Sequence, residues 1–205
     1  MKITLILASN SPRRKEILSS VGAKFTVIPS NADEITDSTL LPYEIACENA
    51  RLKGRDVYAQ TPDVDGESEE IFVIAADTVV DFCGTVYGKP KDRDEAVAML
   101  TSMSGTAHAV HTGYSIIRCS DGTEISDTET TYVTFDELSE HDVESIISGD
   151  SPYDKAGAYA IQGSAAPYIC GITGCYLNVV GFPLHAIRRA MLDNFGVALE
   201  DCKKR

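Results

Sequence analysis

The sequence predicts an α/β fold in which helices flank a mixed, curved sheet. Strand-like apolar runs and segments of helical periodicity are interleaved along the chain. Two long strand-like runs, 107–118 and 124–135, are joined by the turn Ser120-Asp121-Gly122, which is typical of an antiparallel hairpin. The 205 residues, 43% of them hydrophobic, suffice for one large domain or two small lobes with a real core.

The first half of the chain begins with a strand and a helix. The apolar run from Ile3 to Leu7 is typical of a buried strand. Ser11 is a favourable N-cap and Pro12 suits the first helical position, so a helix is expected to continue over 14–21 and to stop at Gly22. The sequence then predicts a strand over 24–28, a helix from Pro42 to Val57 and a central strand over 71–80.

Turn and cap residues indicate the remaining elements. A hairpin over 79–87 is expected to turn at Cys83-Gly84, and Asp92 is expected to cap the next helix. The acidic stretch 61–70 is predicted to be a solvated surface loop. Beyond the long hairpin, the sequence predicts a helix from Ser139 to Gly149, short strands near 158–161, 168–172 and 176–180, and a last helix that opens at Pro183.

Charge and cysteine content restrict the partners and the compartment. The net charge of -13 disfavours nucleic acid and anionic membrane surfaces as partners. We find no signal peptide and no segment of transmembrane length, and the six cysteines contain no CxxC pair. We therefore expect reduced thiols and a cytoplasmic location.

Two arginines in the first turn of the first helix suggest an anion site. Arg13 and Arg14 are unfavourable there, because the helix dipole prefers negative charge at its N-terminus. A phosphate docked at this turn would be bound by free backbone N–H groups, serine hydroxyls and the two guanidinium groups. The alternative is a capped helix whose arginines are only solvated.

Asp77 lies inside an apolar run, where an unpaired carboxylate is costly. It could bind a metal or act as a general base at the edge of a cleft, or it could be a buried residue satisfied by backbone N–H groups. Gly88-Lys89-Pro90 fails the P-loop pattern, because three residues separate Gly84 from Gly88 and Pro90 replaces the required Ser or Thr. Lys89 could still reach a phosphate as a point charge.

Gln162 and the histidines are less informative. Gln162 follows the strand expected near 158–161, so it could read the edge of a nucleobase or make a strand-end hydrogen bond. His108 and His111 are three apart in a strand-like run, so they should point to opposite faces of the sheet. The sequence therefore gives no support for a zinc site.

Seven blocks, taken together and in order, resemble the Maf (septum-formation-protein-like) family of nucleoside triphosphate pyrophosphatases. They are LASNSPRR at 7–14, AADTVV at 75–80, GKP at 88–90, SGTAHAVHTGY at 104–114, TYVTF at 131–135, YDKAGAYAIQG at 153–163 and NVVGFPL at 178–184. The resemblance implies a single domain over 1–205, related to inosine-triphosphate pyrophosphatases, with two lobes around a nucleotide-binding cleft.

The resemblance also implies the reaction and the residue roles. A nucleoside triphosphate would be cleaved between its α and β phosphates with Mg²⁺ or Mn²⁺, giving the monophosphate and pyrophosphate. Ser9, Arg13, Arg14, Lys53 and Lys89 would contact the phosphates. Asp77 would be the general base, and Glu34 would be a second acidic residue that helps to hold the metal.

The form AGAYAIQG resembles the branch of the family that acts on dTTP and UTP, where Arg14, Thr78 and Gln162 match positions tied to substrate choice. The competing hypothesis is a nucleotide-binding regulator of cell division and septum formation with little turnover. Asp77, Lys53 and Lys89 favour the enzyme, because a pure binder needs no buried base. A homodimer stays open as the assembly state, and Gly54, after Lys53 in place of the family's usual alanine, is expected to loosen its helix by about 1 kcal/mol.

Overall fold

The protein is built on one mixed, seven-stranded sheet. The computed structural model describes residues 2–36, 39–62, 64, 66–149 and 151–202. The strand order is β2-β1-β3-β5-β6-β7, and β4 pairs with β3 outside that path. β1 is parallel to β2 and β3, and the other pairings are antiparallel, so the prediction of a mixed sheet is confirmed. The strands are β1 (Lys2–Leu7), β2 (Phe25–Val27), β3 (Glu69–Phe82), β4 (Thr85–Tyr87), β5 (Ala107–Arg118), β6 (Glu124–Phe135) and β7 (Ile169–Thr173).

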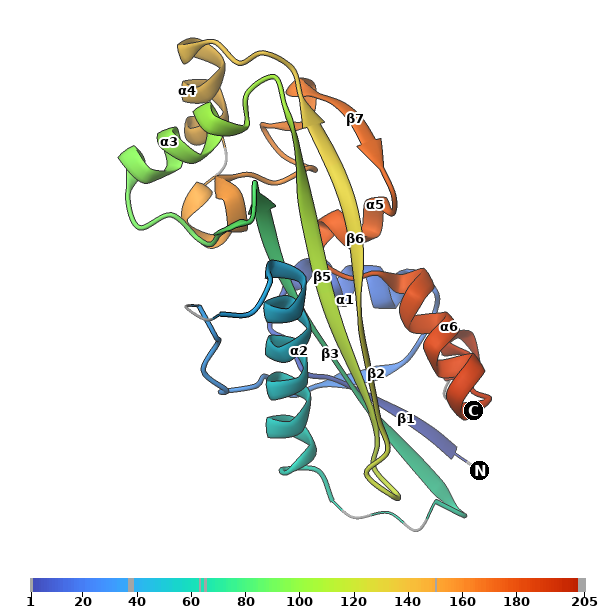
Figure 1. The fold of residues 1–205 in the computed structure, drawn as a ribbon. Helices are drawn as coiled ribbons and strands as arrows, with labels where there is room; N and C mark the ends of the chain where they lie inside the picture. The colour runs from blue at the N-terminus through green and yellow to red at the C-terminus, as the bar shows by residue number, and fades with distance from the viewer. Residues whose placement is uncertain (1, 37–38, 63, 65, 150, 203–205) are drawn as a thin grey trace.

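Helices cover both faces of this sheet. The long α2 packs on β3 and β5, and α5 and α6 contact β5 from the other side (Figure 1). α3 and α4 pack against each other near the far end of the long strands. The helices are α1 (Pro12–Ser20), α2 (Pro42–Tyr58), α3 (Arg93–Met103), α4 (Glu140–Gly149), α5 (Tyr176–Val180) and α6 (Leu184–Phe195).

Alternating side chains of β3 enter different cores, as the period of a strand requires. Phe72 and Ile74 pack among residues of β1, α1 and α6, whereas Val73 packs with Val57 of α2. Farther along, Val80 enters a second large core beneath α3 and α4. β3 therefore contributes side chains to three separate cores.

Two glycines allow α2 to lie close to the sheet. A Cβ atom at Gly113 of β5 would stand 2.2 Å from the carbonyl oxygen of Ala46 on α2. At Gly54 a Cβ atom would stand 3.0 Å from Oγ of Ser115. Gly54 thus lies on the face of α2 that contacts the sheet. The glycine that is expected to lower the stability of the helix is also the residue that allows this close contact.

Two of the short strands expected near the C-terminal end are wrong. Residue 158 instead ends a short 3₁₀ turn (Ala156–Ala158), and residues 159–161 continue without strand structure. In this turn Gly157 and Ala158 have φ of 69° and 65°, a backbone that no strand adopts. Residues 176–180 form α5, because a short apolar run has no period that separates strand from helix. The strand expected near 168–172 is confirmed as β7.

Two local expectations also need correction. Ser11 occupies the N-cap position of α1, but its side chain makes no capping hydrogen bond. The stretch 61–70 is not wholly a solvated loop, because Glu69 and Glu70 begin β3 and Glu70 is buried against Ser120, whose hydroxyl donates to its carboxylate over 2.6 Å.

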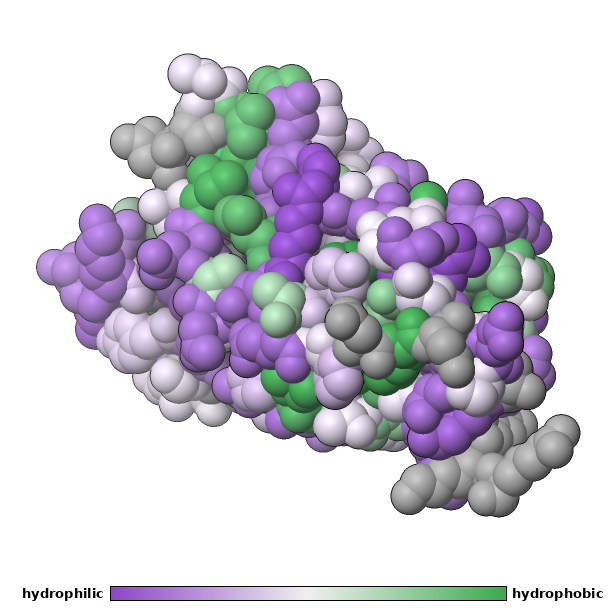
Figure 2. Space-filling model, turned by 90° about the horizontal axis from the view of Figure 1, so that it is seen from below, coloured by the Kyte–Doolittle hydropathy of each residue, from purple (hydrophilic) through white to green (hydrophobic). Residues whose placement is uncertain are grey.

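The surface and the cysteines agree with the composition. Seen from below, the molecule is mostly hydrophilic, and its apolar side chains form small separate groups (Figure 2). All six cysteines are free, as expected. Among the described residues, no helix has the length and apolar content needed to cross a membrane.

Candidate active site

A cleft of about 1110 Å³ opens beside the middle of β3. The last β1 pair on this edge joins Leu7 to Ile74, and the first β4 pair joins Val80 to Tyr87. Between them, residues 75–79 have no strand partner on that edge within the described chain, so this stretch of the edge of β3 is not covered by another strand. All nine site residues predicted from the sequence line this cleft: Ser9, Arg13, Arg14, Glu34, Lys53, Asp77, Thr78, Lys89 and Gln162.

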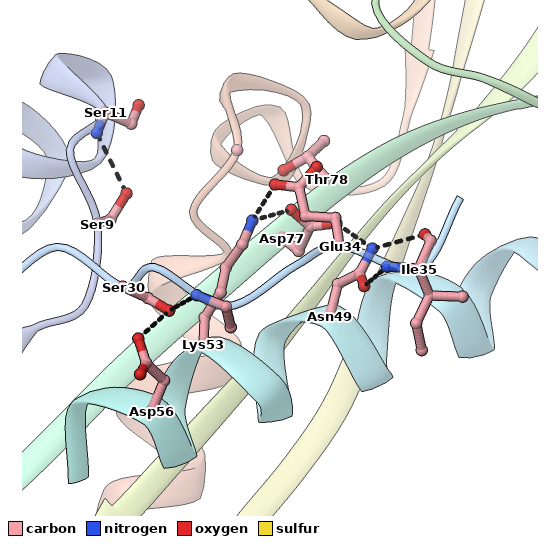
Figure 3. Close-up of polar contacts among 12 residues, drawn as sticks. Ser9, Ser11, Ser30, Glu34, Ile35, Asn49, Lys53, Asp56, Asp77 and Thr78 are labelled. Atoms are coloured by element: carbon pink, nitrogen blue, oxygen red, sulfur yellow. Dashed lines mark hydrogen bonds and ion pairs between the residues drawn. The ribbon is translucent and has the colours of Figure 1, made fainter. Parts of the chain in front are cut away.

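A lysine between two carboxylates forms the centre of the cleft (Figure 3). The ammonium group of Lys53 lies 2.5 Å from Oε1 of Glu34 and 2.6 Å from Oδ1 of Asp77. Asp77 projects from β3 toward α2 and is only 7% exposed. Both carboxylates thus face one cation, and they are the acidic groups that could together hold a metal ion.

The surroundings of Glu34 keep it ionised. Although partial burial acts to raise the pKa of this carboxyl, the hydrogen bond and charge of Lys53 hold the pKa below its ordinary value. The charges of Lys89 and Arg14 act in the same direction. The neighbouring cations of the cleft therefore stabilise the charged form of Glu34.

Arg13 and Arg14, which the sequence grouped together, have different environments. Arg14 donates from Nε to the carbonyl of Gly181 over 2.8 Å and from its terminal nitrogens to Ser9 Oγ and Thr78 Oγ1 over 3.3 and 3.2 Å. Burial lowers the pKa of this guanidinium group, against the opposing charge of Asp77. Arg13 lines the cleft and makes no hydrogen bond or ion pair with the described residues.

Three lysines besides Lys53 line the cleft. Lys89 is exposed beside the cleft, and Lys91 follows it. Lys155 also lines the cleft and donates to Asp154 Oδ1 over 2.7 Å. Lys91 and Lys155 had no functional role in the sequence analysis, because isolated lysines in turns carry no signal of their own.

Gln162 lies in a turn, not at the end of a strand as expected. Its side chain is exposed and lines the cleft. The chain reaches this turn after Gly157 and Ala158, two residues with positive φ. The side chain is therefore accessible to a ligand.

The buried polar residue that the sequence analysis missed is Asn49. It donates from Nδ2 to Oδ2 of Asp77 over 3.2 Å and accepts from the backbone N–H of Ile35 over 2.7 Å. The signal was its position four residues before Lys53, which places both side chains on the same face of a helix.

The histidines lie outside this arrangement. His108 is buried among residues of the second core and contacts the hydroxyl of Tyr159 over 2.6 Å. His111 points to the α2 side and contacts Thr130 and Asp81, so the prediction of opposite faces is confirmed. The described residues contain no group of three or more His, Cys, Asp and Glu side chains suited to a metal ion.

Known proteins similar to this chain share its length as well as its motifs. The profile of the family described as "Maf-like protein" matches residues 4–194. A dTTP/UTP pyrophosphatase of Thermococcus gammatolerans is 49% identical over 183 residues, which are 89% of this chain and 92% of the relative. A dTTP/UTP pyrophosphatase of Alkaliphilus oremlandii is 42% identical over 195 residues, 95% of this chain and 98% of the relative.

Among solved structures, the Staphylococcus aureus Ham1 protein superimposes with a TM-score of 0.45 and 16% identity, covering 64% of this chain and 71% of that one. The family match spans the cleft from the Ser9 turn to the Gly181 turn, and the relatives cover nine tenths of the chain. On these findings the chain belongs to the Maf family.

Proposed function

We propose that this protein is a nucleoside triphosphate pyrophosphatase that hydrolyses dTTP and UTP to the monophosphate and pyrophosphate. The observation that carries the proposal is the Lys53 ammonium held between Asp77 and Glu34 in a cleft lined by further cations. Two relatives that match nearly the full chain are dTTP/UTP pyrophosphatases. The six free cysteines fit a reducing compartment, and we place the reaction in the cytoplasm.

The cations of the cleft bind the triphosphate. It brings about four negative charges to an acidic protein, so its binding requires local neutralisation. Arg13 and Lys89, which form no hydrogen bond or ion pair with the described residues, contact the phosphates directly. Arg14 is held in advance by Gly181 and Thr78, and such preorganised donors stabilise charge without reorganising during the reaction.

Asp77 acts as the general base. It takes a proton from the attacking water as the bond between the α and β phosphates breaks. Lys53 keeps one oxygen of Asp77 paired, and its charge offsets the charge on the leaving pyrophosphate. Two lobes enclose the nucleotide, one built around β1, α1 and α6 and the other around α3 and α4.

The residues present fit a divalent cation. Glu34 and Asp77 supply hard carboxylate oxygens that already converge on one cation, the Lys53 ammonium. Mg²⁺ and Mn²⁺ are suited to one or two carboxylates together with substrate phosphates. When bound, such an ion lowers the pKa of water and screens the charge of the phosphates.

Base selection is assigned to Gln162, with Thr78 and Arg14 nearby in the cleft. The amide of Gln162 has both a donor and an acceptor, which match O4 and N3–H of uracil or thymine. Its side chain is exposed in the free protein, so the amide donor and acceptor are both available to an entering base.

One assay separates this function from its rivals. Purified protein is incubated with dTTP, UTP, CTP, GTP and ATP in Mg²⁺ or Mn²⁺, and pyrophosphate and orthophosphate are measured separately. Pyrophosphate from dTTP and UTP supports the proposal. Orthophosphate with a nucleoside diphosphate contradicts it, and tight nucleotide binding with negligible turnover favours the regulator of cell division.

A further inference from the structure

Asn49 is a buried polar residue that contacts Asp77 and the backbone of Ile35, the residue after Glu34. Its side chain is 3% exposed and lies on α2, four residues before Lys53. Its amide makes three hydrogen bonds: it accepts from Ile35 N–H over 2.7 Å, donates to the Ile35 carbonyl over 3.2 Å and donates to Asp77 Oδ2 over 3.2 Å (Figure 3).

The orientation of this amide is fixed by its partners. Ile35 N–H is a donor and must face the amide oxygen, whereas the Ile35 carbonyl and the Asp77 carboxylate are acceptors and must face the NH₂ group. A flipped amide would set an oxygen against two acceptors. The asparagine therefore has one stable orientation.

This contact makes the two oxygens of Asp77 different. Oδ1 faces the Lys53 ammonium at 2.6 Å, and Oδ2 faces the Asn49 amide at 3.2 Å. Rotation of the carboxylate would disturb both contacts. Asn49 and Lys53 together set the plane of the carboxylate with respect to the cleft.

The same helix face holds the segment that carries Glu34. Asp56, seven residues after Asn49, accepts from the Ser30 hydroxyl and from Asn31 N–H, each over 2.7 Å. Asn49 holds the other end of the segment at Ile35, next to Glu34. Residues 30–35 are thus attached to α2 at both ends through their backbone. Of the two anchors, Asn49 also reaches Asp77 and Asp56 does not, while Lys53 joins the Glu34 side chain to Asp77 from the same helix.

We propose that Asn49 is a positioning residue that orients Asp77 for proton transfer and keeps Glu34 beside it. The proposal rests on the proposed function in one respect, the role of Asp77 as the general base. The part that concerns the Glu34 segment depends on the hydrogen bonds alone.

Two substitutions separate the contact of Asn49 with Asp77 from its contact with Ile35 N–H. Asn49→Asp keeps an acceptor for Ile35 N–H but removes the donor to Asp77 and sets a second carboxylate beside it. Two adjacent carboxylates resist ionising together, so the acidic limb of the kcat–pH profile should move to higher pH. Asn49→Leu removes both contacts and should lower kcat about 10- to 100-fold, with a smaller change in KM.

Amide hydrogen exchange measures how firmly residues 30–35 are held to α2, and it needs no assay of activity. Ile35 N–H should exchange faster in Asn49→Leu and stay protected in Asn49→Asp. The matched control is Asp56→Ala, which should speed the exchange of Asn31 N–H and lower kcat less than Asn49→Leu does, because Asp56 does not contact Asp77.

A folded Asn49→Asp protein with wild-type kcat and an unshifted acidic limb overturns the proposal. So does a loss of kcat in Asp56→Ala equal to that in Asn49→Leu, since the segment alone would then explain both. If wild-type protein releases no pyrophosphate, the proposed function fails, while the exchange of Ile35 N–H still decides whether Asn49 holds the Glu34 segment.

Discussion

Asp77 on β3 lies directly opposite Gly113 on β5 in the antiparallel pair. The base proposed for the reaction and the glycine that admits α2 are therefore cross-strand neighbours. The missing side chain of Gly113 lets α2 approach until Lys53 and Asn49 both reach Asp77.

Gly113→Ala should damage both stability and activity. The new methyl group would meet the backbone of α2 at Ala46, which cannot move aside as a flexible side chain can. We expect a loss of about 1–3 kcal/mol in the free energy of unfolding, as for other overpacked sites, together with a lower kcat. Urea unfolding and steady-state kinetics measure the two effects. Gly88→Ala, where a Cβ atom meets nothing within 4 Å, is the stability control.

Asp77→Asn should abolish most of the turnover. The amide keeps the size of the side chain but cannot accept the proton, so kcat should fall by about two orders of magnitude or more with the fold intact. Circular dichroism and kcat are the measurements. Asp127→Asn, on β6 outside the cleft, is the matched control and should retain wild-type turnover. Near-normal turnover in a folded Asp77→Asn protein would remove Asp77 from the role of base.

Arg13→Ala and Arg14→Ala should behave differently. Arg13 forms no hydrogen bond or ion pair with the described residues and opposes the helix dipole, so its removal should leave the melting temperature of the free protein equal or slightly higher. Its loss should weaken nucleotide binding about tenfold, as expected for a hydrogen bond to a charged group.

Arg14→Ala should instead destabilise the free protein by about 1–3 kcal/mol, because the Gly181 carbonyl loses its donor. Thermal melts with and without dTTP distinguish the two variants. An Arg13→Ala protein that melts as early as Arg14→Ala and binds nucleotide normally would make Arg13 structural.

Gln162→Glu should change the ranking of substrates. The carboxylate cannot donate to O4 of uracil or thymine, so kcat/KM for dTTP and UTP should fall about tenfold, the lower end of the cost of an unsatisfied polar contact. The lower end applies because the side chain is exposed in the free protein. The ratios of kcat/KM for dTTP, UTP, CTP and GTP are measured on both forms. An unchanged ranking would assign base selection elsewhere.

The buried His108 should make the folded protein sensitive to mild acid. Burial lowers the pKa of His108 to about 4, whereas the unfolded chain titrates near 6.5. As the pH falls from about 6.5 to about 4, the unfolded state gains a proton that the folded state lacks, so stability falls by up to about 1.4 kcal/mol per pH unit. Below this window both states are protonated and the contribution no longer changes.

Urea unfolding between pH 7.5 and pH 4 tests this against His108→Gln, which should show a shallower decline. The control is His185→Gln, on the exposed side of α6, which should follow the wild type. Parallel curves for wild type and His108→Gln would contradict the assignment.

Strong local patterns made most of the fold predictable. The β5–β6 hairpin matched its predicted bounds because both strands are long and a turn residue in the left-handed region, Gly122, separates them. The segments around Ala158 and Tyr176 were wrong because short apolar runs have no distinguishing period and tertiary contacts decide their form.

The sequence predicted which residues form the site better than it predicted which contacts they make. The motifs named nine residues that line one cleft, but the separate environments of Arg13 and Arg14 depend on the Gly181 carbonyl, 167 positions away from Arg14. The role of Asn49 depends likewise on a loop 14 positions earlier in the chain, and no local pattern reports such a partner.

The two large cores share their strands. β3 contributes Phe72 to one core and Val80 to the other, and β5 contributes Ile116 and Val110 in the same way. Because these strands run without a break from one core to the other, they contain no flexible linker that could absorb a change in the width of the cleft. We expect it to be spread as a slight bend and twist of the ladder, with the backbone hydrogen bonds intact. Opening and closing of the cleft are then elastic deformations of the sheet, and the free-energy cost rises continuously with the displacement.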